Sequence, residues 1–378
     1  MRRRIELDAA RGAMLLWMTL THLPTIISVY ANQPFGFVSG AEGFIFLAAL
    51  FTGRIYSLVA EQNGYPAMAS QLWMRALRLY AYHVILLGFA FVVVAHLAAA
   101  GNRPALHNLL DFYFAAPKQA VIYGALLIYR PPLLDILPMY ITFLLLTPLA
   151  LAAGKKVGWR LVLGGGFTLW LLAQFGLRQM AFDVVTGITG TDIPLSATGS
   201  FDLFAWQFMW LVGLYCGVRW SKNDLPVGSW AKRMLLPAVI IVPILLVLRY
   251  SVGRGVELGI FEVWFDKWHL GVVRIVNFAA IAALLIQFQS LLKPLAIRPL
   301  VTLGQASLQV FCAHLLFCFI GLAIMGDAAL VNGWHEAVLV TTTFVGLFLT
   351  SRIFGKKEQK NARRPILGAG RPIPQFGD

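Results

Sequence analysis

The chain has 378 residues, of which 59% are hydrophobic and only 13% are charged, about half the charged share of a soluble globular protein. This composition excludes a large soluble domain and predicts an all-α polytopic membrane protein. The formal net charge of +14 would suggest a nucleic-acid partner in a soluble protein. Membrane topology explains the charge better here, so we expect no nucleic acid.

Hydropathy predicts a single bundle of about ten transmembrane helices. The segments outside the predicted helices lie alternately on the two sides of the membrane. Of the 31 Lys and Arg residues, 22 fall in the segments on the side of the N-terminus, seven in the segments on the other side, and two within the predicted helices. The positive-inside rule then places both termini in the cytoplasm. We predict one membrane domain over residues 1–353 and a basic, disordered cytoplasmic tail over 354–378. The predicted spans lie near 12–31, 36–60, 76–100, 132–153, 161–177, 203–220, 234–250, 269–291, 299–325 and 335–353.

The first predicted helix carries two ionisable side chains on one face. Arg11 and His22 are eleven residues apart, which is about three turns and roughly 16 Å along a helix. Arg11 would lie at the cytoplasmic edge and His22 near mid-bilayer, where ionisable groups are expensive and usually functional. The pair suggests a phosphorylated donor held at the inner surface and a base half a membrane away.

Three more arginines are predicted near the cytoplasmic side. Arg54 lies near the inner end of the second span, while Arg75 and Arg78 enter the third, three residues apart on one helix face. Because guanidinium groups bind phosphate bidentately, these residues and Arg11 could form a phosphate site. The alternative is ordinary positive-inside flanking, which is weaker for Arg54 because an apolar stretch follows it.

A different set of polar residues falls in the outer half of the predicted bundle. Glu42 lies roughly 9 Å deep in the second span, at a depth comparable to His22. A carboxylate that orients an imidazole makes a competent general base, so we predict that Glu42 pairs with His22. His314 is the competing base, and no partner is predicted for it. The other polar residues, for which hydrogen bonds between helices are the alternative, are Asp135, Gln207, Arg274 and Asn277.

The predicted outer loops 101–131, 178–202 and 251–268 are rich in aromatic and acidic residues. Such side chains suit a carbohydrate ligand, and an aromatic belt at the membrane interface is the alternative. The three cysteines have no CxxC spacing, so neither a disulfide nor a metal site is predicted.

Several motifs together resemble a known family. Arg-x10-His at Arg11 and His22, and Arg-x-x-Arg at Arg75 and Arg78, resemble the signatures of the membrane superfamily that O-acylates extracytoplasmic sugars. The detailed pattern is similar to the OpgC family, whose members add succinyl groups to osmoregulated periplasmic glucans. The stretches that carry this resemblance begin at Ile5, Ala41, Leu133, Phe204, Arg274 and Leu308.

The resemblance implies a multi-pass enzyme of the bacterial inner membrane. It would transfer an acyl group from cytoplasmic acyl-CoA, with succinyl-CoA as the expected co-substrate, to glucan hydroxyls in the periplasm. His22 would be the general base, and no permanently bound cofactor is implied. Arg11, Arg54, Arg75 and Arg78 would bind the donor. The residues for the acceptor or the acyl group would be Asp135, Tyr140, Gln207, Arg274, Asn277 and His314, with Arg274 on the distal succinyl carboxylate.

Two other functions stay open at this point. In a proton-coupled secondary transporter, the intramembrane His, Glu and Asp residues would relay protons. However, the two halves of the chain show none of the internal symmetry typical of transporters. A non-catalytic component of a glucan export assembly would leave Arg11 and His22 without a role. The expected partners are the lipid bilayer, acyl-CoA and the glucan, and homo-oligomerisation is left open.

Overall fold

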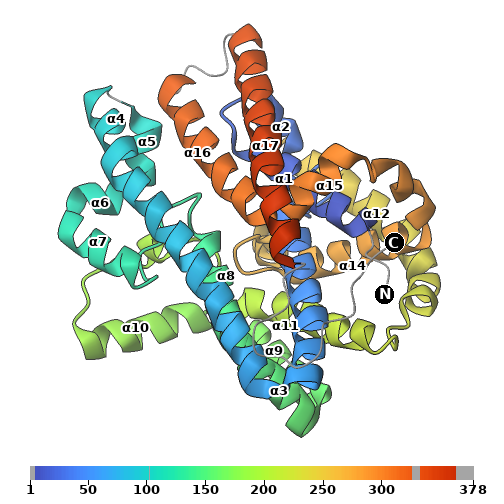
Figure 1. Cartoon of the computed structure of the whole chain (residues 1–378). Helices are drawn as coiled ribbons and strands as arrows, with labels where there is room; N and C mark the ends of the chain where they lie inside the picture. Colours follow the sequence, from blue (N-terminus) through green and yellow to red (C-terminus); the bar gives the residue numbers. More distant parts are fainter. Residues whose placement is uncertain (1–4, 102, 326–332, 363–378) are drawn as a thin grey trace. The chain divides into compact units, whose positions relative to one another are not determined.

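The computed structural model describes residues 5–101, 103–325 and 333–362, and the regular elements within these ranges are all helical (Figure 1). Two short π-helical segments, Ala90–Val94 and Gly154–Gly158, join α3 to α4 and α8 to α9. The α-helices are α1 (Ile5–His22), α2 (Ile26–Ala31), α3 (Gly40–Phe89), α4 (Ala95–Ala100), α5 (Pro104–Leu109), α6 (Asp111–Ala115), α7 (Pro117–Ala125), α8 (Ile136–Ala153), α9 (Trp159–Ala173), α10 (Leu177–Thr189), α11 (Leu203–Ser221), α12 (Val227–Val252), α13 (Glu262–Phe265), α14 (Val272–Gln287), α15 (Arg298–Gln305), α16 (Ser307–Met325) and α17 (Gly333–Ala362).

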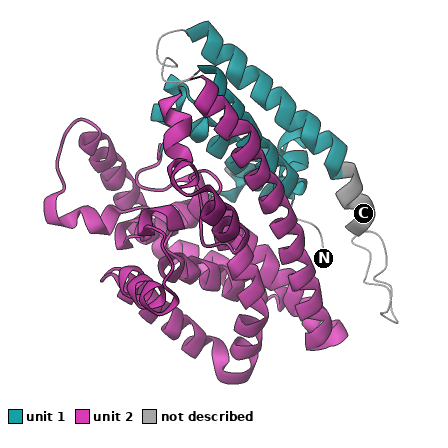
Figure 2. Cartoon of the chain, turned by 90° about the vertical axis from the view of Figure 1, so that its left-hand side faces the viewer, with its two compact units in different colours: residues 1–32, 288–378 teal, residues 33–287 magenta. Residues whose placement is uncertain are grey.

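The chain divides into two compact units, which Figure 2 shows in different colours. Unit 1 contains both ends of the chain, residues 1–32 and 288–378, and unit 2 contains residues 33–287. Each unit is described by itself below. The predicted single membrane domain over residues 1–353 stays a prediction.

Six helical stretches in the described residues are long and apolar enough to cross a membrane, so the predicted class is confirmed. The count of ten spans and the side of each terminus stay predictions. Two of the six stretches, Gly40–Ala100 and Ile136–Ala173, each cover two predicted spans. The predicted span 269–291 contains the shorter apolar helix α14, and the span 299–325 is divided at Ala306 between α15 and α16.

The helix α3 consists of two arms that meet at Gly64. This residue has φ 83° and ψ 167°, a conformation that glycine adopts readily because it has no Cβ. Pro66 follows in the first turn of the second arm, where a missing N–H costs no helical hydrogen bond. Figure 1 shows the two arms joined at a sharp bend. The predicted spans 36–60 and 76–100 therefore correspond to the two arms, and helix replaces the loop expected between them.

Small residues bring the first arm of α3 into close contact with α11. A Cβ added at Gly217 would overlap the carbonyl oxygen of Leu50 and lie 2.7 Å from the backbone nitrogen of Arg54. One turn earlier on α11, a Cβ at Gly213 would lie 2.6 Å from the Cβ of Ala49. This Gly-x-x-x-Gly pair lets two apolar helices pack backbone to backbone, as is common inside membranes.

In unit 1, α1 packs against α15 and α16, and α17 packs against the same two helices. The helix α17 continues to Ala362, past the predicted start of the cytoplasmic tail at residue 354. Lys, Gln and Glu in 356–360 are good helix formers, so the helix extends into the segment predicted as the tail. The predicted disorder of this tail stays a prediction. The rest of that tail, residues 363–378, lies outside the described residues.

Candidate functional site

Unit 1 places two histidines against each other. His22 is the last residue of α1, and its Nδ1 lies 3.4 Å from Nε2 of His314 on α16. The rings are stacked, with centroids 5.7 Å apart and planes inclined by 20°. His314 is fully buried, whereas His22 is partly exposed. No partner was predicted for His314 from the sequence, and in the structure its ring lies against that of His22, the other candidate base.

The backbone around His314 determines which ring nitrogens carry protons. Nδ1 of His314 lies 2.6 Å from the carbonyl oxygen of Phe311, which can only accept a hydrogen bond, so Nδ1 carries the proton. Nε2 of a neutral His314 then accepts, and Nδ1 of His22 donates to it. This order leaves the lone pair of a neutral His22 on Nε2, which makes that atom the basic position of the pair.

Arg11 also faces α16, three turns before His22. Its guanidinium donates to the hydroxyl of Ser307, which is the first residue of α16. The prediction that Arg11 and His22 share one face of the first helix is therefore confirmed, because both contact α16. A cation beside the first residues of a helix adds its charge to unpaired backbone N–H groups, and this combination attracts anions.

Unit 2 contains a buried ion pair between Glu42 and Arg274. Nε of Arg274 donates to Oε1 of Glu42 at 2.8 Å, and Nη2 contacts the same oxygen. The other carboxylate oxygen accepts from the backbone N–H of Ser39 at 2.9 Å and from its hydroxyl at 2.5 Å. Ser39 and Glu42 form the capping box that begins α3, and this is why the carboxylate occupies this position.

Both oxygens of Glu42 are thus engaged within unit 2, whereas His22 belongs to unit 1. The predicted pairing of His22 with Glu42 stays a prediction. Arg274 and Asn277 are one turn apart on α14 and both are completely buried. Asn277 accepts from the backbone N–H of Phe37 at 2.7 Å, so it fixes the segment that leads into α3.

The predicted donor-binding arginines of unit 2 have separate contacts. The guanidinium of Arg54 lies 3.7 Å from the centre of the Trp220 ring, a cation–π contact with α11. Arg75 on the second arm of α3 donates to Thr52 at 3.2 Å and to the hydroxyl of Tyr140 at 2.6 Å. The structure therefore joins a predicted donor residue, Arg75, to a predicted acceptor residue, Tyr140. Arg78, one turn further, is exposed.

Asp135 and Gln207 hold loops and helices together in unit 2. A carboxylate oxygen of Asp135, just before α8, accepts from the backbone N–H of Ser200 at 3.2 Å. Gln207 on α11 donates to the carbonyl oxygen of Gly166 on α9 at 2.7 Å. The Gln207 contact agrees with the alternative of hydrogen bonding between helices, whereas the Asp135 contact holds a loop.

Sequence reasoning missed two cations in the predicted outer loops. Arg178 on α10 donates to Thr198 at 2.8 Å and to neighbouring carbonyl groups of the loop before α11. The ammonium group of Lys267 lies 4.7 Å from the centre of the Trp268 ring. Burial lowers the pKa of Lys267, while the carboxylates of Glu42 and Asp135 oppose this shift. The sequence could have indicated both residues, because Arg and Lys are uncommon in the outer loops of membrane proteins.

The aromatic residues of loop 101–131 stack on one another. Tyr113 stacks on Phe91 with ring centres 4.3 Å apart, and Phe112 meets Tyr129 edge to face at 5.1 Å. Phe91, Phe112 and Tyr129 are buried. Phe91, Phe112 and Tyr129 therefore belong to a small internal core. The carbohydrate ligand and the interfacial belt both stay open for the predicted outer loops.

Within the described ranges, no group of three or more His, Cys, Asp or Glu side chains is arranged to hold a metal ion. The family model described as OpgC protein matches residues 3–359, which is nearly the whole chain. No curated protein and no solved structure matches the chain.

Proposed function

Because the chain belongs to the OpgC family, we propose that it is a membrane acyltransferase that moves a succinyl group from succinyl-CoA to hydroxyls of periplasmic glucans. The observation that carries this proposal is the histidine pair of unit 1, in which the buried His314 orients the partly exposed His22. The membrane-spanning helices support a reaction that joins a cytoplasmic donor to a periplasmic acceptor.

The donor enters from the cytoplasmic side in this proposal. Arg11, three turns before His22 on α1, binds a phosphate of coenzyme A together with the first backbone N–H groups of α16. The distance of roughly 16 Å along α1 between Arg11 and His22 is available to the pantetheine arm, which carries the thioester toward His22.

The chemical step is a general-base reaction. A sugar hydroxyl has a high pKa and attacks a thioester slowly unless its proton is removed as the new bond forms. Nε2 of His22 takes this proton while the hydroxyl oxygen attacks the acyl carbonyl, the C–S bond breaks, and coenzyme A leaves and regains a proton as its thiol. The resulting imidazolium of His22 keeps its hydrogen bond to His314, which therefore acts as a positioning residue.

The test uses the full-length protein in liposomes, with succinyl-CoA on one side and glucan on the other. Mass spectrometry of the glucan is expected to detect succinyl esters. His22→Ala is expected to lower the rate by about 10²–10⁴ with coenzyme A binding retained. His96→Ala, at an exposed position on α4, is the matched control and should keep the wild-type rate. Wild-type activity in His22→Ala would contradict the base assignment.

A second variant tests the positioning role of His314. His314→Phe removes the nitrogen that accepts from His22 but keeps an aromatic ring in the buried position. We expect a smaller loss of rate than in His22→Ala and a changed pH profile, because the tautomer of His22 is no longer fixed. An unchanged pH profile would show that His314 only fills space.

A further inference from the structure

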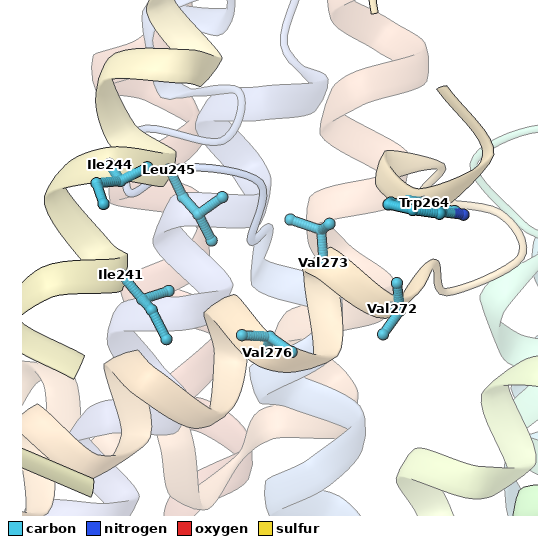
Figure 3. Close-up of a pocket in the computed structure, with 7 residues that line it drawn as sticks. All are labelled: Ile241, Ile244, Leu245, Trp264, Val272, Val273 and Val276. Atoms are coloured by element: carbon cyan, nitrogen blue, oxygen red, sulfur yellow. The ribbon is translucent and has the colours of Figure 1, made fainter. Parts of the chain in front are cut away.

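An apolar groove lies between α12 and α14 in unit 2. Figure 3 shows that Ile241 and Leu245 of α12 point toward Val273 and Val276 of α14, with Trp264 at one end near Val272. The cavity has a volume of about 360 Å³, and its lining side chains are all apolar except for the indole nitrogen of Trp264. Where the groove ends, Ala238 packs against Ala280 and Ala283 and brings the two helices together.

The helix α12, which forms one side of this groove, is suited to a hydrocarbon environment. The helix α12 is long and apolar enough to cross a membrane, and only 6% of its most apolar window is buried inside the protein. A groove without polar partners does not retain water. In a bilayer, the molecules next to such a helix are lipids, so the chain that fills the groove is a lipid acyl chain.

A cation lies one turn beyond the groove on the same helix face. Arg249 follows Leu245 by four residues, so the two side chains are neighbours along α12. Its Nε is buried and has no hydrogen-bond partner among the described residues. Its Nη1 lies 3.6 Å from the position of a Cβ at Gly253, so the guanidinium folds over the end of α12. Buried donors without a partner are rare and call for one.

This end of the groove has the features of a membrane interface. The predicted topology places Arg249 at the outer end of its span, where the positive-inside rule disfavours cations. Trp264 is half-exposed on the same side of the helix pair, as is common for indole rings at the level of lipid headgroups. The neighbouring Ile260 and Phe261 are also exposed, which a position in the interface accommodates.

We propose that this groove is a binding site for an anionic phospholipid, with an acyl chain between α12 and α14 and the phosphate on Arg249. The lipid acyl chain contacts Leu245 and Val276, and the lipid phosphate accepts hydrogen bonds from the guanidinium of Arg249. Trp264 closes the end of the groove at headgroup level. This site is independent of acyl transfer and lies entirely within unit 2.

The experiment measures lipid binding to the full-length protein by native mass spectrometry, with phosphatidylglycerol and phosphatidylcholine as probes. The wild-type protein is expected to prefer phosphatidylglycerol. Arg249→Gln should lose this preference, with an affinity for phosphatidylglycerol about tenfold lower, as for one charge-assisted hydrogen bond. Arg254→Gln, which changes an exposed cation on the following loop, is the matched control and should bind like the wild type.

A second pair of variants tests the groove itself. Val276→Trp fills the cavity and should weaken binding of both lipids, whereas Val239→Trp adds the same ring at an exposed position of α12 outside the groove. The proposal is overturned if Arg249→Gln keeps the phosphatidylglycerol preference, or if Val276→Trp and Val239→Trp bind both lipids equally well. Arg249 lies in the last turn of α12, away from the packing of Ala238 against Ala280 and Ala283, so Arg249→Gln remains informative if Val276→Trp does not fold.

Discussion

The ion pair between Glu42 and Arg274 allows a quantitative prediction. Both side chains are buried, with relative exposures of 0% and 1%, and Nε of Arg274 donates to the carboxylate at 2.8 Å. Removing one partner of such a pair leaves an uncompensated buried charge and typically costs 3–5 kcal/mol, so Glu42→Gln and Arg274→Met should each be destabilised by about this amount.

The double variant should be much less destabilised than the sum of the two single variants. Replacing both partners by uncharged groups removes the desolvation cost of both charges and is often close to neutral. Part of the capping box that begins α3 is weakened as well, which costs about 1 kcal/mol. We therefore expect a net loss of about 1 kcal/mol and a coupling energy of several kcal/mol between the two positions.

The assay is a double-mutant cycle. The free energy of unfolding of each variant is measured by denaturant titration in detergent, with tryptophan fluorescence as the signal for unfolding. The control cycle uses Ser57→Ala and Ser221→Ala, whose hydroxyl groups form a neutral hydrogen bond of 3.0 Å, and it should give a coupling of about 0.5–1.5 kcal/mol. Additive losses below about 1 kcal/mol at Glu42 and Arg274 would refute the ion pair. The predicted pairing of Glu42 with His22 would then be the next cycle to measure.

Three further outcomes are expected. Gly217→Val should separate α11 from α3 and cost at least 1–3 kcal/mol, measured as a lower unfolding midpoint, because a Cβ has no room beside the facing backbone. Tyr140→Phe removes the acceptor for Arg75 and should weaken coenzyme A binding if Arg75 holds the donor, whereas unchanged binding would give Arg75 a packing role. The third concerns Asp266 and His269, in the loop before α14. The hydrogen bond and charge of Asp266 raise the pKa of His269. Burial would raise the pKa of Asp266, but hydrogen bonds from His269 outweigh it and lower that pKa. The stability from this pair should therefore be lost as pH falls through the lowered pKa of Asp266 and as pH rises through the raised pKa of His269. Because both side chains are partly exposed, Asp266→Asn should flatten this pH profile by less than about 1 kcal/mol in unfolding experiments.

The sequence predicted the helical membrane class well, because composition and hydropathy depend only on local residues. It also predicted that Arg11 and His22 share a face, since helical periodicity alone determines this. The single-residue turn at Gly64 was missed, because polar residues around 61–65 look like a loop when only hydropathy is considered.

Partners distant in the chain were the least predictable part of the site. Glu42 and Arg274 are separated by 232 residues, and no periodicity connects them. Both were identified as buried polar residues of the outer half, but their pairing depends on how α3 and α14 pack. Likewise, Arg75 was assigned to the donor and Tyr140 to the acceptor or the acyl group, and their contact depends on how α3 packs against α8.

The histidine pair joins residues separated by 292 positions, because unit 1 is built from the two ends of the chain. During synthesis at about 5–20 residues per second, His22 leaves the ribosome roughly 15–60 s before His314. The helix that carries His22 must therefore wait in the bilayer while all of unit 2 is made. A nascent or C-terminally truncated chain that ends before α16 lacks the residue that orients His22, so activity should appear only when synthesis is nearly complete.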